Sequence, residues 1–597
     1  MSNDPKKLLQ GFLQAALNSV APEYAHIPVQ LERPRQSDHG DFSTNLAMQL
    51  AKPLGRNPRE IANWLVAELP QSTLLQSVAV AGAGFINFTL SPSAKTAIIF
   101  EVLECGGDYG RGADKGQKVQ VEFVSANPTG PLHVGHGRGA AYGASLSNIL
   151  DFAGYCVTRE YYTNDAGRQM DILALSTWLR YLALFDVQIP FPPNAYQGEY
   201  VIHMAEGMAG MHQRRFAHVT AEQILENTPG LPDAVRQDDD AKQQRETHLD
   251  ALIGNAKHLL GQDYLWVHGF VLNEQLSDCR DDLAEFGVLF DHWFSERSLY
   301  DLGLVSRTVD ELEKRGHVYV QDGAKWFRST AFGDEKDRVL QRDNGVYTYF
   351  ASDVAYHLNK YERGFDRLID VWGADHHGYI PRVKGAVAAL GLPVEKLEVP
   401  LVQFAVLYRN GQKTSMSTRA GEFVTLRSLR EEVGNDACRF FYVLRKSDQH
   451  LDFDLDLATS QSSENPVYYI QYAHARICSV LRGWAGDEKQ LAAATLALLQ
   501  SDYELALCAR LGAFPELIQN AAADYAPHQL AFYLKDLAGE FHRWYNAERM
   551  LVGDVALQQA RLALAAAVRT VLAAGLKLLG VSAPEQMQWT DEQAEKQ

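Results

Sequence analysis

The spacing of apolar residues divides the chain into three regions of different character. In the first region, helical runs at Lys7–Ser19 and Pro58–Glu68 and a β-like segment at Gly84–Leu90 predict a small α/β module. From Val119 onward, short apolar strands alternate with helices, which is typical of a parallel sheet. After about Ser460 the apolar positions recur at helical spacing without a break, and this pattern predicts an all-helical end.

The predicted parallel sheet is interrupted along the sequence. Between roughly residues 161 and 304 the strand pattern is lost. The part at Ala221–Ala256 is polar, acidic and helix-prone, so we expect an inserted helical subdomain there. The sheet is then predicted to resume with strands near Tyr347–Phe350, Leu368–Trp372 and Leu397–Leu407.

Composition limits the class of protein. With 597 residues, of which 46% are hydrophobic and 22% charged, the chain is expected to form roughly three to five globular domains. The apolar run Leu562–Leu579 contains Arg569 and Lys577, so it predicts a packed bundle helix and not a lipid-facing span. The start, Met1–Lys7, lacks an apolar signal core. The six cysteines form no C-x-x-C pair, which favours reduced thiols in the cytoplasm and no structural zinc site.

The net charge of −18 bears on possible partners in two opposite ways. Many nucleic-acid-binding proteins are basic overall, so this charge counts against such a partner. Local basic segments nevertheless occur at Arg427–Arg430 and Arg439–Lys446, and an acidic pocket would suit a cationic ligand. The overall charge therefore decides little by itself.

The stretch Ser125–Gly139 carries the strongest chemical signal. It follows the strand-like run Val119–Val124 and opens an alanine-rich helix, so backbone N–H groups and the positive end of the helix dipole meet at one turn. His133 and His136 fall on the same side of that turn, and Gly135 between them leaves room for a nucleotide. The turn is therefore predicted to hold the phosphates of ATP.

The tetrapeptide His133–His136 resembles the HIGH motif of class I aminoacyl-tRNA synthetases, although small nucleotidylyltransferases share a His-x-Gly-His turn. The longer stretch from Ser125 to Arg138 is similar to that of arginyl-tRNA synthetases in particular. Four later segments agree with this family in order and spacing: Tyr349–Asp353, Trp372–His377, Met416–Gly421 and Tyr472–Arg476. The resemblance extends to about Met587, and Gln588–Gln597 is expected to be a polar extension.

The resemblance implies a multidomain α/β protein. A Rossmann-type parallel-sheet catalytic core with a helical insertion would be flanked by a small N-terminal α/β module and an all-helical C-terminal domain. The implied activity is ATP-dependent ligation of L-arginine to tRNA(Arg) through an arginyl-adenylate, with release of AMP and pyrophosphate. The ligands would be ATP with Mg2+, L-arginine and tRNA(Arg). A cytoplasmic monomer is expected, with no membrane association and no protein-bound structural metal.

The implied domain limits follow the three regions. They are a tRNA-elbow-binding module at 1–110, the catalytic domain at 111–405 with its insertion at about 161–304, a KMSKS-like loop and stem-contact region at 406–459, and a helical anticodon-binding domain at 460–597. For tRNA contacts the resemblance points to Phe85 and Asn87 in the first module, and to Tyr472, Arg476, Trp544 and Tyr545 in the last domain. Aromatic residues at helical spacing are equally consistent with a packed core.

The resemblance also assigns side chains around the two small substrates. His133 and His136 would act on the phosphates, ATP would contact Gly135, Gly373 and Asp375, and arginine would contact Glu122, Ser125, Asn127, Tyr349, Asp353 and His377. Chemistry agrees for Glu122 and Asp353, because an ammonium and a guanidinium both need acceptors. Asp353 also fits the N-cap of a helix. The run Asp375–His377 contains zinc-ligand types, but adjacent residues seldom converge on one ion.

The second class I signature, Lys-Met-Ser-Lys-Ser, is altered in this chain. Ser415–Arg419 aligns with it, but serine and threonine replace its two lysines, while Met416 and Ser417 remain assigned to ATP. Developing charge on pyrophosphate needs a cation, so another group must take over this role. Lys413 and Arg419 are the nearby candidates, with Mg2+ sharing the load, and the sequence does not choose between them.

Three other functions fit parts of the pattern. A class I synthetase for a different amino acid would have a less acidic pocket. A noncatalytic tRNA-binding relative would explain the lost lysines, but His133, His136 and Asp353 are all retained. A small-molecule nucleotidylyltransferase would need neither the N-terminal module nor the helical C-terminal part.

Overall fold

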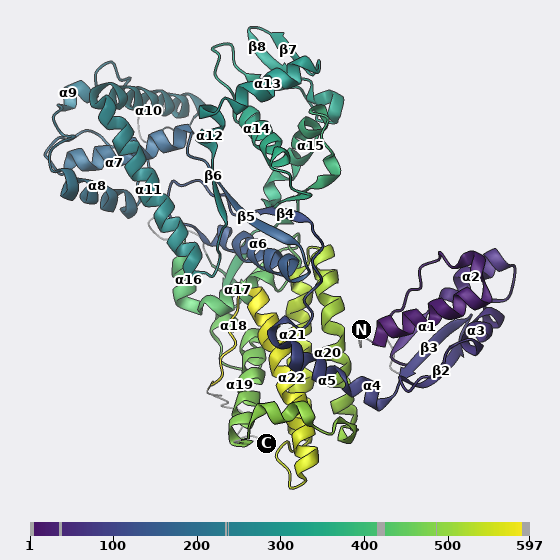
Figure 1. The fold of residues 1–597 in the computed structure, drawn as a ribbon. Coiled ribbons are helices and arrows are strands. Elements are labelled where there is room, and N and C mark those ends of the chain that lie inside the picture. Colours follow the sequence, from purple (N-terminus) through teal and green to yellow (C-terminus); the bar gives the residue numbers. More distant parts are fainter. Residues whose placement is uncertain are drawn as a thin grey trace.

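The computed structural model describes residues 5–34, 39–232, 236, 238–414, 424–484 and 486–587. Figure 1 shows a central sheet that carries two further units above it and a helical bundle below it. The N-terminal module lies beside the bundle. The three kinds of region predicted from the apolar pattern are all present.

The N-terminal module has an apolar core of its own. Three helices pack with a three-stranded antiparallel sheet of order β1-β3-β2. The elements are α1 (Pro5–Val20), β1 (Phe42–Thr44), α2 (Leu46–Leu54), α3 (Pro58–Ala67), β2 (Leu75–Ala81) and β3 (Phe85–Leu90). The two helices and the strand predicted for this module are confirmed. Polar contacts reach the bundle: Lys6 Nζ donates to Glu516 at 2.7 Å, and Arg33 donates to the backbone carbonyl of Gly512 at 3.0 Å.

Five parallel strands form the central sheet, in the order β12-β10-β4-β5-β6. They are β4 (Lys118–Glu122), β5 (Cys156–Thr163), β6 (His292–Ser295), β10 (Arg367–Asp370) and β12 (Leu397–Glu398). From β4 the chain adds β5 and β6 on one side and later returns to β10 and β12 on the other. In an open α/β sheet, ligands bind beyond the carboxyl ends of the strands at such a change of direction.

One predicted strand is wrong. Tyr347–Phe350 was expected to continue the sheet, but Tyr347 makes an isolated bridge to Gln341 and Tyr349 begins helix α14 (Tyr349–Glu362). The aromatic residues at this point have high β propensity, which favours an extended prediction. Thr348 is the N-cap of α14, so the chain turns helical one residue later.

The other two predicted strands are partly confirmed. Leu368–Trp372 contains most of β10 and the start of a short strand, β11 (Trp372–Gly373). Leu397–Leu407 is divided among three strands, of which β12 joins the central sheet. The others are β13 (Leu401–Val402), which pairs with β11, and β14 (Ala405–Arg409), which pairs with β15 (Gln412–Lys413) and β16 (Leu451–Asp454).

The predicted helical insertion leaves the sheet after β5 and returns at β6. It has a separate apolar core and consists of α7 (Arg168–Ala183), α8 (Glu199–His212), α9 (Ala221–Ile224), α10 (Asp239–Leu260) and α11 (Gln262–Glu285). A second unit between β6 and β10 was not predicted. It contains α12 (Glu296–Asp301), α13 (Leu304–Lys314), β7 (Val318–Gln321), β8 (Ala324–Phe327), β9 (Arg338–Gln341) and α14, and α15 (Ile380–Ala389) packs against it.

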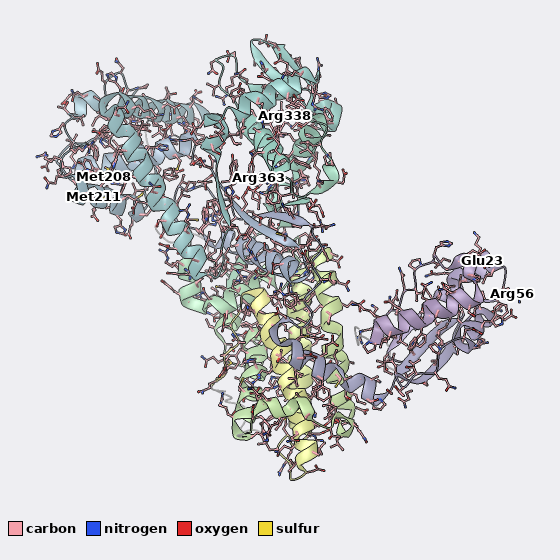
Figure 2. All side chains as sticks on the ribbon, in the orientation of Figure 1. Glu23, Arg56, Met208, Met211, Arg338 and Arg363 are labelled. Carbon is pink, nitrogen blue, oxygen red and sulfur yellow. The ribbon has the colours of Figure 1, made fainter. Side chains whose placement is uncertain are left out.

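Figure 2 shows how this second unit meets the rest of the molecule. Arg338 lies within the unit, whereas Arg363 lies where the unit approaches the central sheet. The guanidinium of Arg363 pairs there with Glu160 of β5, which is fully buried. The unit is therefore joined to the sheet by buried charge as well as by apolar packing.

The C-terminal part is a helical bundle, as predicted. Its main helices are α19 (Pro466–Trp484), α20 (Asp502–Ala523), α21 (Pro527–Ala547) and α22 (Val555–Leu579), and α16 (Leu426–Val433), α17 (Asn435–Val443) and α18 (Leu455–Thr459) precede them. Within the described residues, α22 is the one helix long and apolar enough to cross a membrane, but 78% of that stretch is buried, as in a core helix. Helix α5 (Ile98–Cys105) packs against α22, although it falls within the predicted N-terminal domain.

Three arginines of the basic segments are engaged by groups of the protein itself. Arg427 pairs with Asp278 at 2.8 Å, and Arg430 pairs with Glu285 at 2.9 Å, both on helix α11. Arg439 is fully buried in α17. Arg427 and Arg430 thus pair with acids of the protein, and Arg439 is held by the Leu579 carbonyl, whereas Arg445 and Lys446 are exposed.

Helix α6 (Val134–Phe152) lies between the central sheet and the bundle and is buried along most of its length. Glycines allow this close approach. A Cβ atom on Gly143 would lie 2.3 Å from the ring of Phe123, and one on Gly137 would lie 2.7 Å from the hydroxyl of Tyr442. The helix is therefore held from both sides.

This packing gives a stability prediction. Gly143→Ala is expected to destabilise the protein by about 1–3 kcal/mol, because the ring of Phe123 is buried and has no room to move. Gly139→Ala, on the same helix, is the matched control: a Cβ there meets nothing within 4 Å. The control should be neutral or stabilising by up to about 1 kcal/mol through helix propensity. Thermal denaturation of both variants would measure the difference, and equal melting temperatures would contradict the packing argument.

Candidate active site

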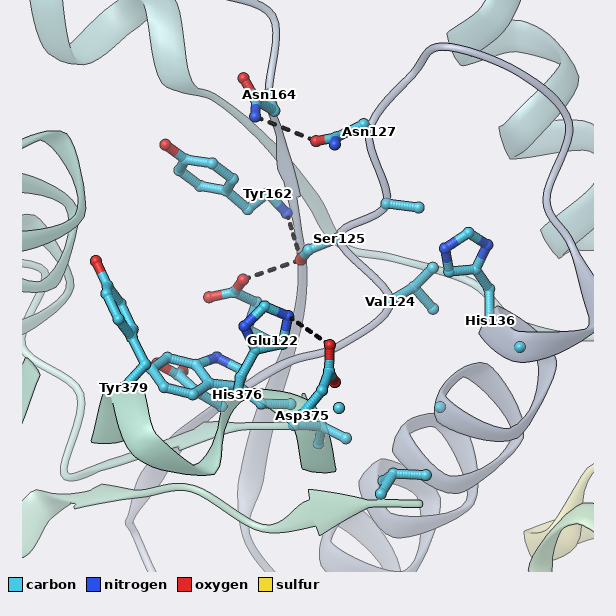
Figure 3. Close-up of a pocket in the computed structure, with 18 of the residues that line it drawn as sticks. Glu122, Val124, Ser125, Asn127, His136, Tyr162, Asn164, Asp375, His376 and Tyr379 are labelled. Carbon is cyan, nitrogen blue, oxygen red and sulfur yellow. Dashed lines mark hydrogen bonds and ion pairs between the residues drawn. The ribbon is translucent and has the colours of Figure 1, made fainter. Parts of the chain in front are cut away.

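A cavity of about 580 Å³ lies at the carboxyl ends of β4, β5 and β10 (Figure 3). It joins segments that are far apart in the sequence: the turn after β4, the start of α6, the end of β5, one face of α14 and the β11 loop. The predicted site residues that line it are Glu122, Ser125, Asn127, His133, Gly135, His136, Asp353, Gly373 and Asp375. This is the position that the sheet topology predicts for a ligand.

The two histidines form the start of helix α6. His133 is the N-cap, and its Nδ1 accepts a hydrogen bond from the backbone N–H of Gly135 at 3.1 Å. His136 Nδ1 accepts in turn from the backbone N–H of His133 at 3.3 Å, and the two rings stack with centroids 3.7 Å apart. Because each Nδ1 accepts, each neutral ring carries its hydrogen on Nε2.

Burial keeps both rings neutral. It lowers the pKa of His136 to about 3, with a further contribution from His133, and it also lowers the pKa of His133. At neutral pH the pair therefore offers two Nε2–H donors without positive charge. Such donors, at the positive end of the α6 dipole, suit phosphate oxygens. The backbone N–H groups of Val134, Gly135 and His136 already donate within the protein, so they are not available in the free protein.

The opposite end of the cavity is acidic. Glu122 ends β4, and its Oε1 accepts from the hydroxyl of Ser125 at 2.9 Å. The backbone between them is unusual, because Val124 and Ser125 have φ values of 67° and 43°. Non-glycine residues seldom adopt this left-handed conformation, and such strain is concentrated at functional sites. Here it turns the chain back so that Ser125 meets Glu122, and Tyr162 donates its backbone N–H to the Ser125 hydroxyl at 3.1 Å.

Asp353 lies in the second turn of α14 and accepts a hydrogen bond from the hydroxyl of Tyr379. Burial raises its pKa above the usual value, and the hydrogen bond from Tyr379 partly offsets this. The alternative reading of Asp353 as an N-cap is wrong, because Thr348 occupies that position. The carboxyl group therefore does not cap the helix and lines the cavity instead.

A further buried acid, Glu296, was missed in the sequence. It begins α12 directly after β6, is 2% exposed, and its Oε1 accepts from the Ser352 hydroxyl at 3.0 Å. Its Oε2 and the hydroxyl of Tyr162 are both buried and make no hydrogen bond in the described structure. Burial raises the pKa of Glu296 to about 7, and the charge of Asp353 adds to this effect. Glu296 does not itself line the cavity, so its effect on a ligand there would come from its charge, beside that of Asp353.

Polar side chains bridge the rim of the cavity. Asn164 donates to Asn127 Oδ1 at 3.1 Å, and Asn127 donates to Gln169 at 2.9 Å. On the other side, Asp375 lies 3.5 Å from His376, and Phe404 lines the cavity near Gly135 with 47% of its surface exposed.

Two predicted arginine contacts lie off the cavity lining. Tyr349 is 58% exposed, and His377 is also exposed. Among the described residues no group of three or more His, Cys, Asp or Glu side chains is arranged to hold a metal ion.

The second signature contributes little in the described structure. Met416, Ser417 and Arg419 lie outside the described residues. Lys413 is exposed in β15, and the cavity lining holds no lysine or arginine in the part of the chain that the structure describes.

The predicted tRNA contacts are distributed over two surfaces. Phe85 is 41% exposed in the N-terminal module, and Asn87 beside it accepts from the hydroxyl of Ser43 at 2.7 Å. Trp544 is fully buried in the bundle, so the core reading is correct for this residue.

In the bundle, a single arginine joins the other two predicted aromatics. The guanidinium of Arg476 lies 4.7 Å from the ring centroid of Tyr472 and 4.5 Å from that of Tyr545. All three side chains are half-buried. Stacked guanidinium and aromatic planes are a surface on which bases can stack.

Comparisons with known proteins agree along the whole chain. The family model for the class I (R) tRNA synthetase catalytic domain matches residues 99–181 and 284–451. The model for the arginyl-tRNA synthetase N-terminal domain matches residues 7–90, and the DALR anticodon-binding domain matches residues 470–587.

Complete relatives show the same similarity. The arginine–tRNA ligases of Azoarcus sp. (strain BH72) and Dechloromonas aromatica (strain RCB) are 75% and 67% identical to the chain, over 98% of its length and 100% of theirs. A putative arginyl-tRNA synthetase from Campylobacter jejuni superposes with a TM-score of 0.72 at 30% identity, covering 83% of this chain and all of its own. The Thermus thermophilus arginyl-tRNA synthetase shares the fold, with a TM-score of 0.72 at 23% identity over 98% of this chain and all of its own. The chain therefore belongs to the arginyl-tRNA synthetase family of class I.

Proposed function

We propose that the chain ligates L-arginine to tRNA(Arg) in two steps, using ATP with Mg2+. In the first step the carboxylate of arginine attacks the α-phosphate of ATP, which gives arginyl-adenylate and pyrophosphate. In the second, a terminal ribose hydroxyl of tRNA attacks the adenylate carbonyl and AMP leaves. The observation that carries this proposal is the single cavity that joins a neutral histidine pair to a group of carboxylates.

The two ends of the cavity suit the two ends of the reaction. The Nε2–H groups of His133 and His136 would donate to phosphate oxygens. Because both rings are neutral, they would not repel the Mg2+ that accompanies ATP. Glu122 would accept from the α-ammonium of arginine, while Asp353 would face its guanidinium and the buried charge of Glu296 would act on the guanidinium without direct contact. Alignment of the two substrates, with stabilisation of the charge that develops on phosphate, is then the main catalytic contribution.

The remaining assignments also stay proposals. Lys413 and Arg419 would offset pyrophosphate charge, and Met416 and Ser417 would contact ATP. The surfaces around Phe85 and Arg476 would bind tRNA. The reduced cysteines are consistent with a cytoplasmic location, and a monomer is the expected form.

The activity is tested by aminoacylation of total tRNA with each labelled amino acid in turn, with ATP and Mg2+ present. Arginine alone should become attached to tRNA. Attachment of another amino acid, or of none, would contradict the proposal.

His136→Ala should lower kcat by about 100-fold or more, because a donor aimed at the charge that develops on phosphate is lost. The affinity for tRNA, measured by filter binding, should stay within about twofold. A loss of tRNA affinity as large as the loss of turnover would point to misfolding instead.

Glu296→Gln should act in opposite directions on stability and on arginine use. The pKa of Glu296 is raised to about 7 in the folded protein, so its favourable neutral form is lost as pH rises through that value. At pH 8 the neutral glutamine should therefore stabilise the free protein by about 2–3 kcal/mol, with little effect at pH 5. Arginine KM should rise, because one negative charge near the guanidinium is lost.

The pH dependence of wild-type KM gives a second measurement. Arginine KM should fall between pH 6 and 8, since Glu296 attracts the guanidinium only when it is ionised, and this slope should flatten in Glu296→Gln. Glu395→Gln, at an exposed site, serves as the control. An unchanged slope, or a destabilised variant at pH 8, would remove Glu296 from the site.

A further inference from the structure

A buried lysine lies directly behind the acidic end of the cavity. Lys360, near the end of α14, has no solvent exposure. Its ammonium donates to Glu122 Oε2 at 2.5 Å and to Asp370 Oδ1 at 2.7 Å. Both carboxylates end strands of the central sheet and line the cavity, whereas Lys360 does not line it. Any effect of Lys360 on a substrate must therefore pass through these two acids.

The contacts divide the two oxygens of Glu122 between different tasks. Oε2 is held by Lys360, while Oε1 accepts from the Ser125 hydroxyl at 2.9 Å. A carboxylate oxygen can accept two hydrogen bonds, so Oε1 keeps one acceptor position. Figure 3 shows this carboxyl group beside Ser125 and pointing into the cavity. In the described part of the chain, the hydrogen bonds to this carboxyl group come from Lys360 on the inner side and from Ser125 on the cavity side.

The lysine itself is firmly held. Asp370 is fully buried and its second oxygen lies 3.0 Å from His357 Nε2, while the ring of Tyr356 lies 4.3 Å from the ammonium. Burial alone would lower the pKa of Lys360, but Asp370 and Glu122 raise it above its usual value. A charge that is buried, paired twice and packed on a ring is well suited to orient a neighbour.

We propose that Lys360 is a positioning residue for arginine, which fixes the carboxyl group of Glu122 so that Oε1 stays aimed at the α-ammonium of the substrate. This inference rests on the proposed function, which gives Glu122 that ligand. It adds a source of selectivity: the site recognises the α-amino group through a carboxylate that the protein has oriented before the substrate arrives.

The test uses two arginine analogues as competitive inhibitors of aminoacylation. Agmatine keeps the amine and lacks the carboxylate, whereas 5-guanidinopentanoate keeps the carboxylate and lacks the amine. In Lys360→Met, arginine KM and the agmatine Ki should rise by about tenfold or more. The Ki of 5-guanidinopentanoate should change by less than about twofold. Equal changes for all three compounds, or an unchanged agmatine Ki, would overturn the proposal.

Arg363→Met, at the C-cap of the same helix α14, is the matched control. It removes a partly buried cation from Glu160, which does not line the cavity. It should lower thermal stability without changing the ratio of the two inhibition constants. A ratio that changes as much as in Lys360→Met would mean that loss of any cation on α14 suffices, and would reject a specific role for Lys360.

Two further variants keep the outcome clear. Lys360→Met combined with Asp370→Asn removes one positive and one negative group, so it should recover stability while the ratio stays altered. If the ratio of the two inhibition constants also recovers, Lys360 only balances charge, and the proposal is overturned. Glu122→Gln should change the ratio in the same direction; if it does not, the assignment of Glu122 is wrong. A wild-type protein that attaches no arginine to tRNA would instead contradict the proposed function itself.

Discussion

The position of helix α6 is the constraint on which the catalytic geometry depends. Arg138, in its second turn, is buried and donates to the backbone carbonyls of Gln403, Gln449 and Lys446 at 2.8, 2.7 and 3.0 Å. Burial lowers the pKa of Arg138 to about 10, so the guanidinium is still charged at neutral pH. Gln403 lies between β13 and β14, and the other two carbonyls lie between α17 and β16. One side chain thus fixes the histidine turn relative to the loop that carries Phe404.

The neutral donors and the carboxyl groups of the cavity lie apart, because they come from different elements. The first turn of α6 presents uncharged donors, while β4, β10 and α14 present carboxyl groups along the same opening. Neutral histidines do not attract the acids, and Lys360 pairs with Glu122 and Asp370, so Glu296 has no cationic partner in the described structure. In the free protein the acids near the cavity therefore carry more charge than the cations beside them neutralise. A ligand with two positive groups and one carboxylate, such as arginine, would reduce this excess. Unfavourable burial of charge before binding is a recognised cost of a specific site.

The histidine turn could be predicted because its structure is local. The strand, the turn and the N-cap all lie within one short stretch. Gly135, in the same stretch, leaves the space that the turn needs. Glu296 and Lys360 could not be found in this way. Glu296 follows a short strand hidden inside a region that the pattern assigned to an insertion, and Lys360 has the sequence surroundings of an ordinary surface lysine. Their burial is set by tertiary packing, which periodicity does not report. The same reason explains Arg427, whose partner lies on a helix about 150 positions earlier.

The contact between the N-terminal module and the bundle differs in kind from the other interfaces. The module keeps its own core, and Lys6 and Arg33 reach the bundle through an ion pair and a single carbonyl. Partly exposed polar contacts of this type are screened by salt and contribute little on their own. These contacts therefore hold the angle of the module less strongly than the buried hydrogen bonds of Arg138 hold α6. Added salt is expected to weaken the ion pair of Lys6 and to leave the buried hydrogen bonds of Arg138 almost unchanged.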